Sequence, residues 1–245
     1  ESDSTLVIKA ASLDNQTGQL RALGSSGKTN FQIGGLFDNR NGTLETANSD
    51  LTLNATSFQN LGGNLLHVGG GTFDISTANI TNAGGSLVTH GGLTLTADNW
   101  TNSSVIQAGR LTINVNNLTQ TSTGQLLAST RLEGNGVNWT NEGLIATDGT
   151  ASLTLSGSYS GNGRYSSRGD LALTAASMSL GSAGSVASGG TSTIDVRGQL
   201  NNYGRMTSAS GMNVDAGSIN NFGTLGSSGN LRLVASSLLN QNGLI

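Results

Sequence analysis

The segment 231–245 reads Leu231-Arg-Leu-Val-Ala-Ser-Ser-Leu-Leu-Asn-Gln-Asn-Gly-Leu-Ile245, and degenerate copies of this pattern run through the whole chain. The copies share the frame apolar-x-apolar-x-Ala, then apolar-x-Asn, then a glycine-bearing turn, an apolar residue and a small residue. Clear copies begin at Met212 and Leu51. A unit of roughly twenty residues, repeated about twelve times, is typical of a solenoid, because no single unit can bury its apolar face alone.

Three columns of apolar residues can be followed from copy to copy. The first is an alternating pair that opens each unit, the second is the apolar residue before Asn, and the third follows the glycine-bearing turn, as at Leu65 and Leu87. Alternation with a period of two predicts strands with one inward face, and no stretch keeps a helical period for three turns. The first column is expected to hold Leu6/Ile8, Phe31/Ile33, Leu51/Leu53, Phe73/Ile75, Leu93/Leu95, Leu111/Ile113, Leu132, Leu153/Leu155, Leu171/Leu173, Ile194/Val196, Met212/Val214 and Leu231/Leu233.

These columns predict an all-β fold, a right-handed parallel β-helix of about twelve rungs with three short strands per rung, where a rung is one turn of the helix. Parallel strands stack about 4.8 Å apart, so the rungs would form a rod about 55 Å long. The handedness follows from the usual right-handed crossover between parallel strands. Residues 1–245 are expected to be a single β-helical repeat domain and a piece of a longer protein.

A column of asparagines follows the second apolar column. Asn tolerates a positive φ, and stacked identical amides can bond from one strand to the next. Trp100 and Trp139 occupy the apolar position before this column and are expected to fill the core rather than to form ligand platforms. The expected asparagine column is Asn15, Asn39, Asn60, Asn82, Asn102, Asn141, Asn202, Asn221 and Asn240, with Gln120 as a near match.

The asparagine column is interrupted in the eighth and ninth units. In its place stands Tyr159-Ser-Gly-Asn-Gly-Arg-Tyr-Ser-Ser-Arg168. One interpretation is a corner rebuilt with glycine, in which Tyr159 and Tyr165 only occupy the apolar columns. The other is a protein-recognition patch of Tyr159, Arg164, Tyr165 and Arg168, because Tyr and Arg are enriched in interface hot spots. Tyr165 is expected to point inward in either case, so Arg164 and Arg168 are the better candidates for exposed contacts.

The composition excludes several classes of function. A net charge of −3 with only 11 Lys and Arg argues against a nucleic-acid partner. There is no Cys for disulfides or thiolate metal sites, and no apolar stretch approaches the length of a membrane-spanning helix. Pro is absent as well, which suits a chain made almost entirely of paired strands and tight turns.

No catalytic, cofactor-binding or metal-binding residues are predicted. The 14 acidic residues are scattered along the chain, whereas β-helical enzymes that act on polysaccharides need clustered carboxylates or a calcium site. Asp195 and Asp215 are expected to stack on neighbouring rungs of a solvated face. His67 and His90 occupy different positions within their units, so their side chains are not expected to converge on a metal.

The pattern Leu-x-Leu-x-Ala-x-x-apolar-x-Asn-x-x-Gly-x-Leu resembles the filamentous-haemagglutinin repeat of bacterial two-partner-secretion exoproteins. It is most similar to the repeat region of contact-dependent growth-inhibition effectors of the CdiA type. The resemblance implies a secreted fibre on the surface of a Gram-negative cell, exported through an outer-membrane pore. It also implies contact with an outer-membrane receptor or the surface of a neighbouring bacterium. The Asn-Pro motifs of the family's secretion domain are absent, because the chain has no Pro.

The expected function is therefore structural and adhesive. The segment would belong to the shaft of a growth-inhibition exoprotein, and would extend or form the receptor-contact region of a protein that delivers a toxin. A host-cell adhesin of the filamentous-haemagglutinin kind is an alternative within the same class. A β-helical enzyme acting on a polysaccharide is the alternative from a different class.

Overall fold

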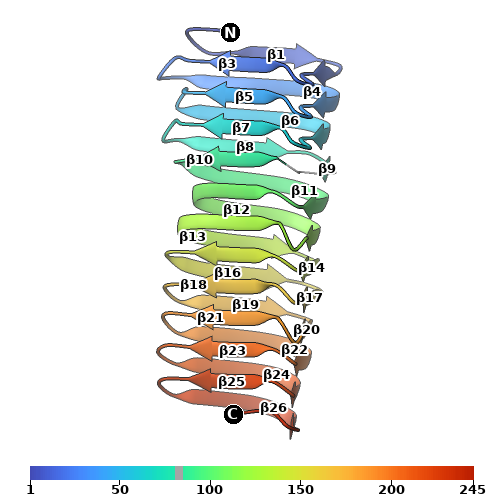
Figure 1. Ribbon diagram of the computed structural model, residues 1–245, viewed down its shortest axis with the longest axis vertical. Helices are drawn as coiled ribbons and strands as arrows, with labels where there is room; N and C mark the ends of the chain where they lie inside the picture. Colours follow the sequence, from blue (N-terminus) through green and yellow to red (C-terminus); the bar gives the residue numbers. More distant parts are fainter. Residues whose placement is uncertain (81–84) are drawn as a thin grey trace.

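The computed structural model describes residues 1–80 and 85–245 and shows a straight rod in which the chain winds from one end to the other (Figure 1). All regular secondary structure in those residues is β-strand, and neighbouring rungs are joined by parallel ladders. The strands that include the first strand of a rung are β1 (Val7–Ala10), β4 (Lys28–Asp38), β6 (Asp50–Gln59), β8 (Thr72–Ser76), β11 (Gly92–Asn102), β12 (Val105–Gln120), β13 (Gln125–Gly136), β16 (Thr150–Leu155), β19 (Leu171–Ala175), β22 (Ser192–Asn202), β24 (Met212–Asn221) and β26 (Leu231–Asn240). Several of them continue into the second strand of the same rung, and β12 and β13 begin with the third strand of the preceding rung.

Two further columns of strands complete each rung. The separate second strands are β2 (Leu13–Asp14), β9 (Asn79–Ile80), β14 (Asn138–Asn141), β17 (Ser158–Gly161) and β20 (Ser177–Leu180). The separate third strands are β3 (Gln19–Ala22), β5 (Thr43–Thr46), β7 (Asn64–His67), β10 (Ser86–Thr89), β15 (Leu144–Thr147), β18 (Arg164–Ser167), β21 (Ser185–Ser188), β23 (Arg205–Ser208) and β25 (Thr224–Ser227). The predicted parallel β-helix with three strands per rung is confirmed, with about eleven turns.

The inward columns are continuous, but at three places the register differs by two residues from the prediction. Phe31 pairs with Leu53 and not with Leu51, so Thr29 holds the preceding inward position. The same shift occurs at β16 and at β22, where Ser192 precedes Ile194. A shift of two residues keeps every side chain on the same face, so alternation alone cannot detect it. The middle inward column is Ile8, Phe31, Leu53, Ile75, Leu95, Ile113, Gly134, Leu153, Leu173, Ile194, Val214 and Leu233.

Both tryptophans are core residues, as predicted. Trp100 and Trp139 are 2% and 1% exposed. The indole of Trp139 extends across the core to the first strand of its own rung, where Gly134 and Gly136 leave room for it. Its Nε1 donates a hydrogen bond to the carbonyl oxygen of Val115, 2.8 Å away. A single large ring thus fills the space that two aliphatic residues occupy in other rungs.

The asparagine column forms a ladder of buried amides. Asn15 Nδ2 donates to Asn39 Oδ1 at 2.7 Å, and Asn39 Nδ2 donates to Asn60 Oδ1 at 2.6 Å. Near the other end, Asn202 Nδ2 donates to Asn221 Oδ1 at 2.7 Å. Asn39 Nδ2 also donates to the carbonyl oxygen of Gly42 at its own corner, and Asn15 Nδ2 donates to that of Thr43 in the next rung. These bonds satisfy polar groups that would otherwise be buried without partners. Asn82, the fourth predicted member, lies outside the described residues.

Candidate contact surface

Tyr159, the first residue of the predicted recognition patch, is buried in the core. It is 1% exposed and stacks in the second column between Trp139 and Met178. Its hydroxyl accepts a hydrogen bond from Asn141 Nδ2 at 3.2 Å. Burial raises the pKa of this phenol to about 12. The hydroxyl therefore takes the place of the amide that the ladder lacks in this rung, where Gly161 stands in the asparagine column.

Tyr165 is also inside the rod, as expected from its place in the third column. It pairs with Ile145 of the preceding rung and with Val186 of the following rung, and it is fully buried. Its hydroxyl donates a hydrogen bond to the carbonyl oxygen of Ala172 at 3.0 Å, and burial raises its pKa well above the ordinary value. Of the four candidate residues, only the two arginines remain at the surface.

Arg164 and Arg168 begin and follow strand β18, and both side chains are exposed. Arg168 Nε lies 3.0 Å from Asp148 Oδ1, and these side chains are 82% and 63% exposed, so the pair contributes little to stability. Arg164 has no ion pair or side-chain hydrogen bond within the described residues. Its guanidinium is therefore available to a partner.

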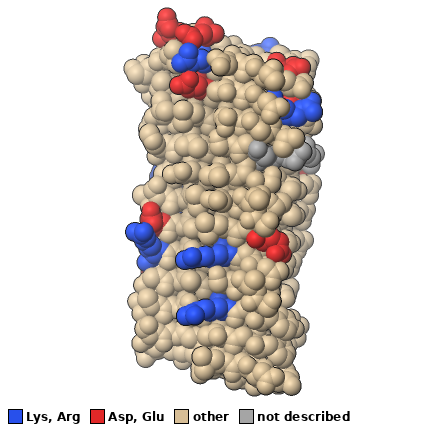
Figure 2. All heavy atoms as spheres, viewed as in Figure 1, with Lys and Arg blue, Asp and Glu red and all other residues tan. Residues whose placement is uncertain are grey.

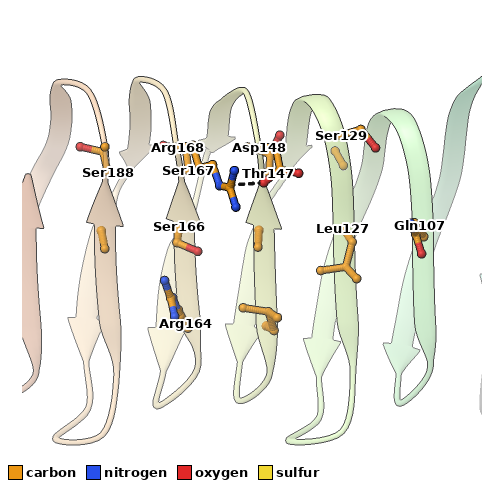
Figure 3. Close-up of a pocket in the computed structure, with 15 residues that line it drawn as sticks. Gln107, Leu127, Ser129, Thr147, Asp148, Arg164, Ser166, Ser167, Arg168 and Ser188 are labelled. Carbon is orange, nitrogen blue, oxygen red and sulfur yellow. Dashed lines mark ion pairs between the residues drawn. The ribbon is translucent and has the colours of Figure 1, made fainter. Parts of the chain in front are cut away.

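The two arginines border an open groove of about 550 Å³ on the outer side of the third strands (Figure 3). Its floor consists of small or apolar outward side chains of β13, β15, β18 and β21. Ser166 is only 8% exposed, and its partners on the neighbouring rungs are the small residues Ala146 and Ala187. The side chains that line the groove include Leu127, Leu144, Ala146, Arg164, Ser166 and Ala187.

The groove lies on what we call the third-strand face, defined as the outward side chains of the third strands. One outward column of this face holds aliphatic residues at several rungs; it runs Arg21, Glu45, Leu66, Val88, Gln107, Leu127, Ala146, Ser166, Ala187, Thr207 and Gly226. The outward positions of the first strands hold instead mostly Thr, Asn, Ser and Asp. Charged side chains occur on the face in view only as scattered groups (Figure 2). Sequence reasoning did not single out Leu66, Val88 and Leu127, although each stands at an alternate, outward position of its strand.

No group of three or more His, Cys, Asp or Glu that could hold a metal occurs among residues 1–80 and 85–245. Asp195 and Asp215 stack on neighbouring rungs, as expected. Within the same residues, no helix is long and apolar enough to cross a membrane.

His67 is a buried structural residue. Its Nε2 donates to the carbonyl oxygens of Asn48 and Ser49 at 3.0 and 3.1 Å, and its Nδ1 lies 2.9 Å from Thr89 Oγ1. Since carbonyl oxygens only accept, the proton is on Nε2 and Nδ1 accepts from Thr89. Burial lowers the pKa of the ring. His90 is exposed, so the two rings do not form a common site.

The haemagglutinin-repeat family model matches residues 1–30, 23–82, 166–221 and 214–245, which together are more than half of the chain. The chain belongs to the haemagglutinin-repeat family. Residues 83–165 lie outside these matches, yet the strand columns continue from β11 through β17. The repeat thus extends through the part of the rod that holds both tryptophans and Tyr159.

One curated relative of this haemagglutinin-repeat chain is a protein named Deoxyribonuclease CdiA from Dickeya dadantii (strain 3937). It is 28% identical over 303 aligned positions, which cover 98% of this chain and 9% of the relative. The chain therefore spans less than a tenth of the length of the protein that it matches. No solved structure gives a significant match to the chain.

Proposed function

We propose that this haemagglutinin-repeat rod is a shaft segment of a secreted, cell-surface exoprotein of contact-dependent growth inhibition, and that it contacts a neighbouring cell through its third-strand face. Two observations carry the proposal: the β-helix of the haemagglutinin-repeat family, and the similarity to a CdiA protein that extends over 98% of the chain. The scattered acidic residues support a mechanical role rather than catalysis. The whole of residues 1–245 would act as one domain within a longer exoprotein.

Export through an outer-membrane pore suits the way this chain folds. Each rung pairs only with the rung before it and the rung after it, so folding can proceed as successive rungs leave a pore. The chain has no Cys and no Pro. No disulfide and no slow prolyl isomerisation therefore interrupts threading or growth of the rod. The delivery of a toxin by the longer protein is part of the same proposal.

The groove beside Arg164 supports a contact role for the third-strand face. It combines small and apolar side chains, such as Leu127 and Ala146, with serine and threonine hydroxyls and an unpaired guanidinium at its edge. Arginine is enriched at protein interfaces, where it contacts both polar and apolar groups of a partner. The partner would be an outer-membrane receptor or another surface component of a neighbouring bacterium.

The test is the double variant Arg164→Ala with Arg168→Ala, measured as binding of the purified, fluorescently labelled segment to bacterial cells. We expect its affinity to fall about tenfold, because a central interface arginine contributes more than 1 kcal/mol. The matched control is Arg110→Ala with Arg232→Ala, which removes two exposed arginines of the first strands and should leave binding unchanged. Undiminished binding by a folded Arg164→Ala, Arg168→Ala variant would exclude this groove as the contact.

The same assay separates the proposal from a host-cell adhesin. Binding to cultured animal cells, with no binding to bacteria, would support adhesion to a host. Cleavage of a polysaccharide by the purified segment would contradict the shaft function altogether.

A further inference from the structure

A pair of aromatic rings is exposed at the corner between the second and third strands. Tyr203 and Phe222 hold the same position on successive rungs, directly after Asn202 and Asn221 of the amide ladder. Their rings stack with centroids 4.9 Å apart and planes 8° apart. Tyr203 is nevertheless 48% exposed, whereas the two tryptophans and the other two tyrosines are buried. The stack is therefore a fixed aromatic surface that faces solvent.

One face of the Tyr203 ring lacks a covering side chain from the neighbouring rung. Phe222 covers the ring from one side, and Gly181 is the residue at the same corner of the rung on the other side. Because Gly181 has no side chain, the ring face toward it has no aromatic or aliphatic neighbour at that position, and the amide of Asn162 is the side chain nearest to Gly181. The phenol oxygen of Tyr203 makes no hydrogen bond within the described residues. This side of the ring is therefore bordered by polar groups.

Unpaired positive charge lies beside this aromatic pair. Arg205 begins strand β23 two residues after Tyr203, and its side chain is exposed without an ion pair in the described part of the chain. Arg164 lies in the same outward column two rungs away, with Ser185 between them. Two rungs correspond to about 10 Å along the rod. The surface therefore offers one aromatic face and two free guanidinium groups along a line parallel to the axis.

We propose that the corner formed by Tyr203, Phe222 and Arg205 binds an acidic polysaccharide that carries hexuronate groups. The C–H face of a pyranose is complementary to the electron-rich face of an aromatic ring. A carboxylate is complementary to the planar fork of a guanidinium group, which can bind it through two parallel hydrogen bonds. A linear polymer along the axis reaches the ring and both arginines without needing a deep pocket.

The surroundings favour a polysaccharide over a protein at this corner. Protein interfaces need an extended apolar core around their aromatic anchors. Here the neighbours are amides and hydroxyls, such as Asn201, Asn220 and Thr224, and Asn220 Nδ2 donates to Asn201 Oδ1 at 2.9 Å. Such groups suit the hydroxyls of a sugar. The inference shares only Arg164 with the cell contact proposed above, and its tests change Tyr203 and Arg205, which lie outside the groove.

The experiment is affinity electrophoresis of the whole chain in native gels that contain polygalacturonate, with dextran gels as the neutral reference. The mobility of each variant is divided by its own mobility in a polymer-free gel, which removes the effect of the altered charge. The parent should be retarded by polygalacturonate only. Tyr203→Ala should weaken the affinity for polygalacturonate by about tenfold, because it removes a stacking contact. Tyr203→Phe keeps the ring, so its affinity should stay within about twofold of that of the parent.

The charge is tested separately. Arg205→Gln should weaken binding by about fivefold at low salt, and the difference from the parent should shrink as the ionic strength rises. The matched control is Arg232→Gln, an exposed arginine on a first strand, which should bind like the parent. Circular dichroism and thermal melting of each variant establish that the rod remains folded.

Three results would overturn the proposal. The first is an unretarded parent in polygalacturonate, and the second is equal retardation in dextran. The third is a folded Tyr203→Ala variant that binds like the parent. Loss of cell binding by Tyr203→Ala without any effect in polygalacturonate would assign the corner to a protein partner instead. None of these results bears on the Arg164 and Arg168 test of the cell contact.

Discussion

Two polar residues inside the rod, Tyr159 and His67, make hydrogen bonds at corners where the repeat departs from its usual residues. Tyr159 shows this most clearly, because its hydroxyl accepts from Asn141 in the rung where the asparagine column is interrupted. His67 does the same at another corner, where its ring joins the carbonyl of Asn48 to the hydroxyl of Thr89. Both side chains interrupt the repeat in the sequence but continue its hydrogen bonding in the structure.

The buried His67 predicts a loss of stability in mild acid. Burial holds its folded-state pKa below the ordinary value of 6.5, which the unfolded chain retains. As the pH falls below about 6.5, the unfolded state takes up the proton first, so the free energy of unfolding decreases toward the folded-state pKa. Thermal melting at several pH values between 7.5 and 5.5 should show a falling melting temperature.

Variants at the two histidines separate this effect from other titrations. His67→Gln should melt lower at pH 7.5 but with a weaker dependence on pH in this range, whereas the exposed His90→Gln should keep the parent's dependence. The carboxyl of Asp50 has a lowered pKa because Thr72 donates to it, and it titrates in more acidic solution. An unchanged pH dependence in His67→Gln would show that another group causes the acid sensitivity.

At the scale of one strand, a glycine in one inward column makes room for a bulky side chain from another column. The strand β13 carries Gly134 at the middle inward position, and the indole of Trp139 from the same rung occupies that space. A Cβ at Gly134 would collide with ring atoms of Trp139 and with the side chain of Leu153. The glycine is required for space, because its φ is not in the positive range.

This arrangement predicts that Gly134→Ala is destabilising only while Trp139 is present. We expect the single variant to lose about 1–3 kcal/mol, the usual cost of overpacking a core. In the background of Trp139→Leu the same change should cost about 1 kcal/mol less or become neutral, which a double-mutant cycle of denaturant unfolding measures. Gly70→Ala is the control, since a Cβ there meets no atom within 4 Å. Equal losses in both backgrounds would mean that the ring does not impose the glycine.

The whole molecule is a linear array, in which each rung is stabilised by its two neighbours. Removal of one complete rung therefore brings two compatible rungs together. Asp195 pairs with Asp215, so deletion of residues 195–214 joins Ile194 to Asp215 in an unchanged register. We expect the shortened rod to keep its β-type circular dichroism spectrum. Small-angle X-ray scattering should show it shorter by about 4.8 Å.

A deletion that is one residue shorter is the matched control. Removal of residues 195–213 places Val214 where Asp195 stood, so the following side chains of the strand exchange faces. That variant should melt roughly 10 °C or more below the in-register deletion, because inward aliphatic groups become exposed and polar groups become buried. Similar melting of the two deletions would show that the corners absorb the register error.

The docking surfaces also belong to this largest scale, because they join residues of different rungs. Tyr203 and Phe222 are far apart in the sequence and contact each other only where two rungs stack. The groove beside Arg164 similarly combines side chains from several successive strands of the third column. Sequence reasoning identified Arg164 from its unusual neighbours, but it overlooked Tyr203, which follows an ordinary Asn of the repeat.

The sequence by itself determined the repeat, the strand columns and the amide ladder. Inward side chains recur at every rung, and a local period of two with a regular Asn corner is visible in the residues alone. The tertiary structure decided the register at β4, β16 and β22, where a shift of two residues preserves the alternation. It also decided which outward side chains meet, as at the aromatic pair of Tyr203 and Phe222. Those contacts depend on the lengths of intervening corners, which set how residues from different rungs align and which no local pattern records.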